Sequence, residues 1–139
     1  MSDKPARRVM RRGGRKLLYY LPALLCIAVL AVSYLQARTP LIVSVAYIAF
    51  SLLSFLLYAK DKWAAQRDAG RTPENTLHML ALLGGWPGAI FAQQLFRHKT
   101  QKASFRIRFW ITVVLNSAVL IWLHTEPGAN YLNSLIANV

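Results

Sequence analysis

Four stretches of the chain are long, apolar and almost free of charge, and short polar segments separate them. Residues 17–35, 41–59, 77–96 and 109–123 contain no Asp, Glu, Lys or Arg, and His78 is the single titratable imidazole among them. Crossing a hydrocarbon layer about 30 Å thick takes roughly 20 apolar residues, which is close to these lengths. A soluble domain of 139 residues has no core large enough to bury four such stretches. The pattern therefore predicts an all-helical integral membrane protein.

The first two predicted helices are joined by a very short loop, residues 36–40. Such a loop forces the spans at 17–35 and 41–59 to be antiparallel neighbours. No stop signal follows the second span, because residues 58–67 are good helix formers. We therefore expect the second helix to continue beyond the membrane until Gly70 ends it.

The third apolar stretch is interrupted. It begins at Thr72-Pro73-Glu74, where Thr is expected to cap the free N–H groups, Pro to take the first helical position and Glu to complement the positive helix end. The interruption consists of residues that end or start helices: Gly84, Gly85, Pro87 and Gly88. Two half-helices are therefore expected, over about residues 75–84 and 87–97.

The distribution of basic residues favours one of two paths for the broken segment 75–97. If the segment crosses as a kinked fourth transmembrane helix, the short basic loop 97–108 lies outside, against the positive-inside rule. If it turns back, all but one of the 17 basic residues lie on the cytoplasmic side. The sequence thus favours a re-entrant segment beside three transmembrane helices, at about 17–35, 41–59 and 105–124. A kinked fourth span stays open, because a helix of this length could cross.

The net charge of +12 would suggest nucleic acid as the partner of a soluble protein. In a membrane protein it is explained by orientation and by attraction to anionic lipids. Residues 1–16 are expected to form a basic cytoplasmic head, in which Gly13 and Gly14 prevent a stable helix. Residues 17–139 then form one helical membrane domain. The prediction is a multi-pass protein of the cell membrane with a cytoplasmic N-terminus.

Few residues suggest a metal, a disulfide or a cofactor. Cys26 is the only cysteine, so no disulfide can form within one chain. The histidines are His78, His98 and His124, which are too scattered to predict a metal site. No phosphate loop or nucleophile motif occurs, and no cofactor is expected. Asn116, near the middle of the last span, is expected to hydrogen-bond to another helix.

The sharpest local signal is a basic cluster after the broken segment. It consists of Arg97, His98, Lys99, Thr100 and Lys102. An Arg can hold two phosphate oxygens and a Lys adds a point charge, so the cluster, together with Arg71, suits a phosphate-bearing ligand. The helix start at the break also attracts anions. In a re-entrant segment that start lies at the membrane tip, too far from the cluster for one phosphate to touch both. The alternative is a charge cluster that only fixes topology.

Three residues are candidates for general acid–base chemistry: Asp61, Glu74 and His78. Glu74 and His78 are four residues apart on one predicted helix and can pair. Each candidate also has a structural explanation. Glu74 is a helix-start carboxylate, His78 an interfacial imidazole, and Asp61 one half of a solvated pair with Lys62, or the partner of a basic residue in the cluster. A binding protein is therefore favoured over an enzyme.

Four short motifs in order carry a resemblance to a known family. They are Tyr58-x-x-Asp61-Lys62-x-Ala64-Ala65, Arg71-x-Pro73-Glu74-x-x-Leu77-His78, Gly84-Gly85-x-x-Gly88-Ala89 and Arg97-His98-Lys99-Thr100-x-Lys102-x-x-Phe105. Residues 45–120 resemble the bacterial and archaeal family called domain of unknown function 1294. The resemblance implies a small multi-span membrane protein but no activity. Some relatives carry a cold-shock domain before the membrane part, which hints at RNA. Here only a short basic head precedes it, without aromatic residues for base stacking.

The favoured function is binding of an anionic, phosphate-bearing lipid or partner at the cytoplasmic membrane surface, through the basic cluster. Two alternatives stay open: a membrane-embedded enzyme acting on a lipid phosphate or acyl group, and a membrane tether for RNA or ribosomes. Membrane lipids, especially anionic ones, are the expected partners. A homodimer is also expected, because the turn at residues 84–88 needs protein to cover its polar backbone at membrane depth.

Overall fold

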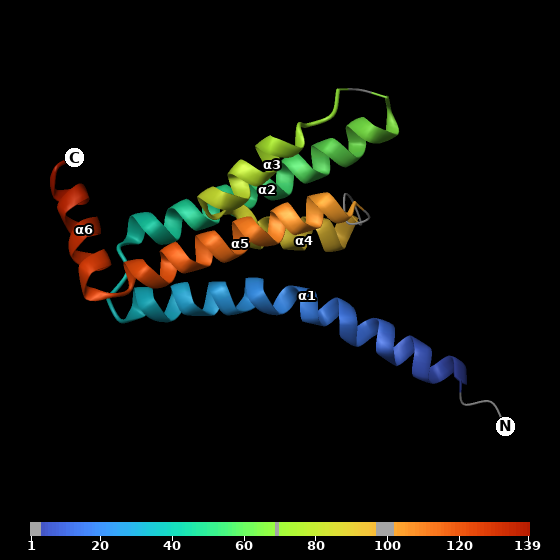
Figure 1. Ribbon diagram of the computed structural model, residues 1–139, viewed down its shortest axis with the longest axis horizontal. Helices are drawn as coiled ribbons and strands as arrows, with labels where there is room; N and C mark the ends of the chain where they lie inside the picture. Colours follow the sequence, from blue (N-terminus) through green and yellow to red (C-terminus); the bar gives the residue numbers. More distant parts are fainter. Residues whose placement is uncertain (1–3, 69, 97–101) are drawn as a thin grey trace.

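In this computed structural model, residues 4–68, 70–96 and 102–139 are described, and their regular structure is entirely helical (Figure 1). The elements are α1 (Lys4–Leu35), α2 (Leu41–Gln66), α3 (Glu74–Leu80), the π-helical turn η1 (Ala81–Gly85), α4 (Trp86–Phe96), α5 (Ala103–Leu123) and α6 (Glu126–Ala137). The prediction of an all-helical chain is confirmed.

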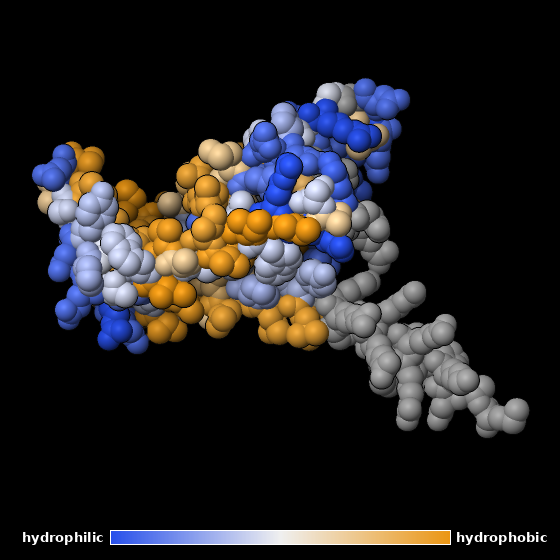
Figure 2. All heavy atoms as spheres, in the orientation of Figure 1, coloured by the Kyte–Doolittle hydropathy of each residue, from blue (hydrophilic) through white to orange (hydrophobic). Residues whose placement is uncertain are grey.

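Four helical segments of the described chain are long and apolar enough to cross a membrane: Leu17–Leu35, Leu41–Gln66, Glu74–Phe96 and Ala103–Leu123. Large apolar side chains of α1, α2 and α5 are exposed along these segments. On the face seen in Figure 2, hydrophobic residues cover the middle of the bundle. Hydrophilic residues gather at the end with α6 and at the end where α2 meets α3. This distribution is typical of a protein whose middle lies in lipid.

The start of α1 differs from the prediction, whereas the end of α2 agrees with it. α1 begins at Lys4, so the expectation that Gly13 and Gly14 prevent a helix is wrong. Each glycine costs about 1 kcal/mol relative to alanine, but the surrounding Lys, Arg and Ala are good helix formers and the segment continues a long helix. α2 extends past the span and ends before Gly70, as expected. The left-handed residue after it is Asp68 (φ 48°), which is tolerable because Asp visits this region more readily than most residues.

The broken segment changes direction at Gly84. Its φ of 111° and ψ of 2° lie outside the helical region, in a conformation that only glycine adopts at low cost. The break is therefore where the sequence predicted it, since the helical conformation of the first arm stops at Gly84. The second arm begins at Trp86, one residue before Pro87.

The positions of the two arms along α2 show that the chain reverses (Figure 1). At the start of the segment, the backbone N–H of Thr72 donates to Oδ1 of Asp61 at 2.7 Å. The turn lies beside Ser51, roughly 15 Å along α2 from Asp61. The return arm then brings Nε2 of Gln93 to 3.0 Å from the hydroxyl oxygen of Tyr58. Because Tyr58 and Asp61 are one helical turn apart, both ends of the segment lie at the same end of the bundle.

The broken segment is also the interior of the bundle. Of the most apolar 18 residues in this segment, 61% are buried, whereas the corresponding share in the other three candidate spans is 17–22%. Every residue from Gly84 to Ile90 is buried. Irregular backbone at membrane depth has to be enclosed by protein, and within this chain α2 and α5 pack against η1 while α1 packs against α4. The homodimer thus stays a prediction that no longer rests on the need to cover the turn.

The C-terminal tail, which lies outside the predicted spans, forms α6. This helix lies across the end of the bundle opposite to the N-terminus (Figure 1). Thr125 precedes it and Pro127 occupies its first turn, which is a recognisable helix start. Gly128 packs so closely on the Trp122 carbonyl that a side chain would overlap it. At the same end, the hydroxyl of Thr39 lies 2.9 Å from Nε2 of His124 and joins the first loop to α5.

Candidate functional site

The basic end of the bundle is defined here as residues 60–74 and 102–108. Its cations in the described chain are Lys60, Lys62, Arg67, Arg71, Lys102, Arg106 and Arg108. Of the three acid–base candidates, Asp61 and Glu74 lie within this range, and His78 lies one helical turn after Glu74 on α3. The cluster residues Arg97, His98, Lys99 and Thr100 lie outside the described residues. Arg71 is exposed just before α3.

Asp61 is fully buried, at 0% exposure. The expected solvated pair with Lys62 is therefore wrong, and the Lys62 ammonium instead lies 5.5 Å from the centre of the Phe96 ring. The Asp61 carboxylate accepts the backbone N–H of Thr72, the residue before the N-cap of α3. α3 has Pro73 at its N-cap and no side-chain cap there. A carboxylate of α2 thus holds the segment that leads into α3.

Glu74 and Lys102 form an ion pair with 3.0 Å between Oε1 and Nζ. Their side chains are 31% and 62% exposed, so the pair contributes at most about 1 kcal/mol. The ion pair holds the start of α3 next to the start of α5. Lys102, which the sequence assigned to ligand binding, therefore has an acidic neighbour within the protein.

His78 stacks on Phe105, with 4.6 Å between the ring centroids and a tilt of 35°. Phe105 is 1% exposed and also meets the ring of Tyr58 edge-on at 6.4 Å. The imidazole is thus part of an aromatic cluster that anchors α3 and α5 on α2. Of the three acid–base candidates, Asp61 is buried, Glu74 is ion-paired and His78 is stacked.

The broken segment, from Thr72 to Phe96, forms a helical hairpin whose turn lies at residues 84–88. At this turn, Asn116 of α5 makes hydrogen bonds to three other residues. Its Oδ1 accepts hydrogen bonds from the Trp86 indole N–H, at 3.0 Å, and from the Tyr47 hydroxyl. Its Nδ2 donates to the carbonyl of Leu82. The predicted hydrogen bond from Asn116 to another helix is therefore confirmed, and it reaches α2, η1 and α4 together. Sequence reasoning missed Tyr47 and Trp86, although both are aromatic residues with a polar atom inside apolar runs.

The glycines of the break serve two different purposes. Gly84 provides the left-handed backbone, whereas Gly85 and Gly88 allow α4 to approach α2 closely. A Cβ on Gly85 would lie 2.6 Å from the Phe50 carbonyl oxygen, and one on Gly88 would overlap the backbone of Ser51. The predicted structural role of these glycines thus corresponds to a backbone-to-backbone contact.

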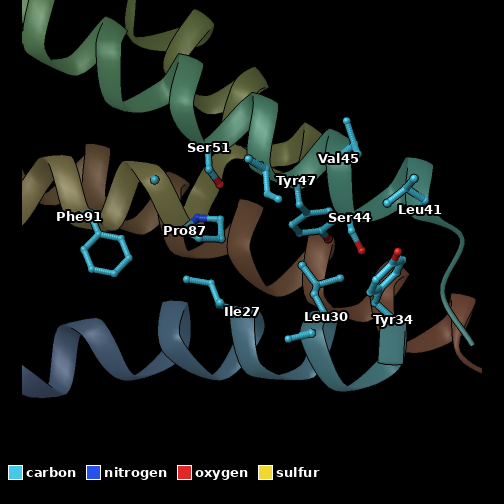
Figure 3. Close-up of a pocket in the computed structure, with 13 residues that line it drawn as sticks. Ile27, Leu30, Tyr34, Leu41, Ser44, Val45, Tyr47, Ser51, Pro87 and Phe91 are labelled. Atoms are coloured by element: carbon cyan, nitrogen blue, oxygen red, sulfur yellow. The ribbon is translucent and has the colours of Figure 1, made fainter. Parts of the chain in front are cut away.

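Among the described residues, two cavities border the broken segment, and a groove between α1 and α5 adjoins one of them. The first, of about 510 Å³, is apolar and lies between α1, α2 and α4. Figure 3 shows Ile27 and Leu30 of α1 facing Tyr47 of α2 and Pro87 and Phe91 of α4 across it. The other two lie next to each other, with three shared lining residues, where α5 approaches Tyr19 of α1. Among the described residues, no group of three or more His, Cys, Asp or Glu is arranged to hold a metal ion.

Comparison with known proteins places the hairpin in a shared region. Residues 51–105 match the model of a family described as "Protein of unknown function (DUF1294)". The "Uncharacterized protein YsdA" of Bacillus subtilis (strain 168) is 31% identical over 87 residues, which are 63% of this chain and 97% of that protein. No solved structure matches the chain. The range matched by the family contains the whole hairpin, the part of α2 from Ser51 onward and Phe105.

Proposed function

This chain belongs to the DUF1294 family, and from that premise we propose that it is a cell-membrane protein that binds anionic, phosphate-bearing lipid at its basic end. In this proposal α1, α2 and α5 cross the membrane with the N-terminus in the cytoplasm. The segment from α3 to α4 enters from the cytoplasmic face and returns to it. The protein is a multi-pass binding protein, with no reaction assigned.

The observation that carries the proposal is that both ends of the hairpin reach the basic end. Thr72 contacts Asp61 and Gln93 contacts Tyr58, so the segment starts and finishes within one turn of α2. The basic cluster at 97–102 follows the return arm directly in the sequence. Cations that collect at one membrane face attract anionic headgroups, at about 1 kcal/mol for each Lys or Arg near the surface.

Binding is favoured over catalysis by the surroundings of the acid–base candidates. Asp61 has no exposed surface, so a substrate cannot contact it in this conformation. Glu74 is held by Lys102 and His78 lies against Phe105. These residues position the hairpin, and the exposed cations are the groups available to a ligand.

The test is lipid retention by the purified full chain. The protein is placed in nanodiscs of phosphatidylcholine with phosphatidylglycerol, and the lipids that stay bound in mild detergent are counted by native mass spectrometry. The proposal predicts enrichment of phosphatidylglycerol over its share in the disc, and less enrichment at high salt. Equal retention of both lipids would refute it.

A substitution that preserves charge separates a ligand site from a topology signal. Arg97→Lys keeps the charge but loses the planar, two-pronged donor. If the cluster binds phosphate in a fixed geometry, this change should weaken retention by about 1 to 3 kcal/mol while leaving topology unchanged. If Arg97→Lys retains phosphatidylglycerol as the parent does, the cluster serves topology and the lipid is bound elsewhere.

A further inference from the structure

A polar cavity of about 230 Å³ lies between α1, α4 and α5. Its polar lining comes from Tyr19 of α1, Gln93 and Gln94 of α4, and Arg106 and Trp110 of α5. Among the described residues that line it, Arg106 is the one that carries a charge. Three helices that are distant in sequence thus bring one guanidinium, two amides, a phenol and an indole to the same hollow.

An apolar groove of about 580 Å³ adjoins this cavity and shares Tyr19, Arg106 and Trp110 with it. The other described residues that line the groove belong to α5: Ile107, Ile111, Val114 and Leu115. Ile107, Ile111 and Leu115 are four residues apart and Val114 is three residues after Ile111, which places them along one side of the helix. Each is more than half exposed. From Ile107 to Leu115 the helix rises about 12 Å, most of the depth of one leaflet's hydrocarbon.

The polar cavity has the donors that an anionic headgroup needs. A guanidinium presents several N–H groups in a plane and can hold two phosphate oxygens together. Arg106 is exposed, and within the described part of the chain it makes no ion pair. Gln93 Nε2 donates to Tyr58, which leaves the Gln94 amide and the Tyr19 hydroxyl as neutral donors at the cavity. Trp110 suits the level of the headgroups, where indole rings concentrate.

We propose that this combined site binds one molecule of an anionic phospholipid. The phosphate lies at Arg106, with Gln94 and Tyr19 beside it, and one acyl chain follows the groove along α5. A small soluble anion would use the polar cavity alone, whereas a neutral lipid would use the groove without needing the guanidinium. The continuity of the two hollows through Tyr19, Arg106 and Trp110 fits a ligand that has both parts. The inference rests on the proposed function and names a site outside the basic cluster.

Arg108 provides a matched control. It is an exposed arginine two residues away on α5, and it lines neither hollow. Arg106→Gln and Arg108→Gln change the net charge equally, so any difference between them reflects position. In nanodiscs with phosphatidylglycerol, native mass spectrometry should find one tightly held phosphatidylglycerol in the parent and in Arg108→Gln. Arg106→Gln should lower its occupancy at limiting lipid by about tenfold, the scale expected for loss of a charged hydrogen bond.

A second pair of variants tests the acyl groove without altering charge. Ile111→Trp fills the groove, whereas Ile121→Trp adds the same bulk at an exposed position elsewhere on α5. Only Ile111→Trp should reduce retention. A titration with inorganic phosphate should fail to displace the lipid. Displacement by phosphate, together with normal retention in Ile111→Trp, would overturn the phospholipid in favour of a small anion.

The outcomes separate this inference from the proposed function. If the parent shows no preference for phosphatidylglycerol over phosphatidylcholine, the proposed function fails. If the parent shows that preference but Arg106→Gln and Arg108→Gln lose it equally, or neither loses it, the assignment of the site to Arg106 is refuted and the proposed function stands.

Discussion

The indole N–H of Trp86 donates to Oδ1 of Asn116 at 3.0 Å, which ties the first residue of α4 to the middle of α5. The same amide oxygen accepts the Tyr47 hydroxyl, and the amide nitrogen donates to the carbonyl of Leu82 in the turn. One side chain therefore satisfies a hydroxyl, an indole and a backbone carbonyl in an apolar region. Such groups are costly to leave without partners, so this amide stabilises the tip of the hairpin.

Replacing Asn116 by Ala should therefore lower stability strongly. The change leaves two buried polar groups and one part-buried carbonyl without their partner, and we expect a loss of about 2 kcal/mol or more in the free energy of unfolding. Thermal unfolding of the purified protein in mild detergent measures it. Ser117→Ala, one residue away and half-buried, is the control and should change little. Equal stability of the two variants would show that the hydrogen-bonded amide does not hold the turn.

The close approach of α4 to α2 predicts a second effect. Gly85→Leu and Gly88→Leu should each impair stable insertion, because the new side chain meets the backbone of α2, which cannot move away without separating the helices. Leu82→Ala removes a partly exposed side chain and should be tolerated. The fraction of protein that is membrane-integrated and resists proteolysis reports the difference. If all three variants integrate alike, the glycines do not mediate a tight contact.

Topology can be tested with single cysteines in a Cys26→Ala background. Gln66 at the end of α2, Ser104 at the start of α5 and Asn130 in α6 are all exposed. With a re-entrant hairpin, cysteines at 66 and 104 should both resist a membrane-impermeant thiol reagent in intact cells, and a cysteine at 130 should react. Reaction at 104 but not at 66 would instead mean that the segment crosses the membrane.

The buried carboxylate of Asp61 predicts a graded loss of stability. Asp61→Ala removes the acceptor of the Thr72 N–H and should cost about 1 to 3 kcal/mol. Asp61→Asn keeps an oxygen there and should cost less, with the difference measuring the contribution of charge. Asp68→Asn removes a charge from an exposed residue and should be neutral. Thermal unfolding ranks the three variants, and an Asp61→Ala protein as stable as the parent would contradict the structural role.

The sequence by itself determined the features that depend on neighbouring residues. The lengths of the apolar runs predicted helices with the dimensions of membrane spans, because hydrocarbon thickness sets helix length. The break at Gly84 was also predictable, since a left-handed turn needs glycine. The continuation of α2 past residue 59 followed from helix propensity. The helix α6 was missed, although Thr125, Glu126 and Pro127 form a recognisable start.

Only the tertiary structure decided which distant residues meet. Charge counting favoured a return of the broken segment, but the reversal itself is fixed by contacts of Thr72 and Gln93 with α2, which no local pattern encodes. Asp61 looked like a solvated residue beside Lys62 and is buried because α3 starts against it. In the sequence, Arg106 is one of many cations. In the structure, it lines a cavity together with Tyr19 of α1 and Gln94 of α4. Helix formation depends on residues within a few positions of each other, whereas burial and polar pairing depend on how packed helices enclose them.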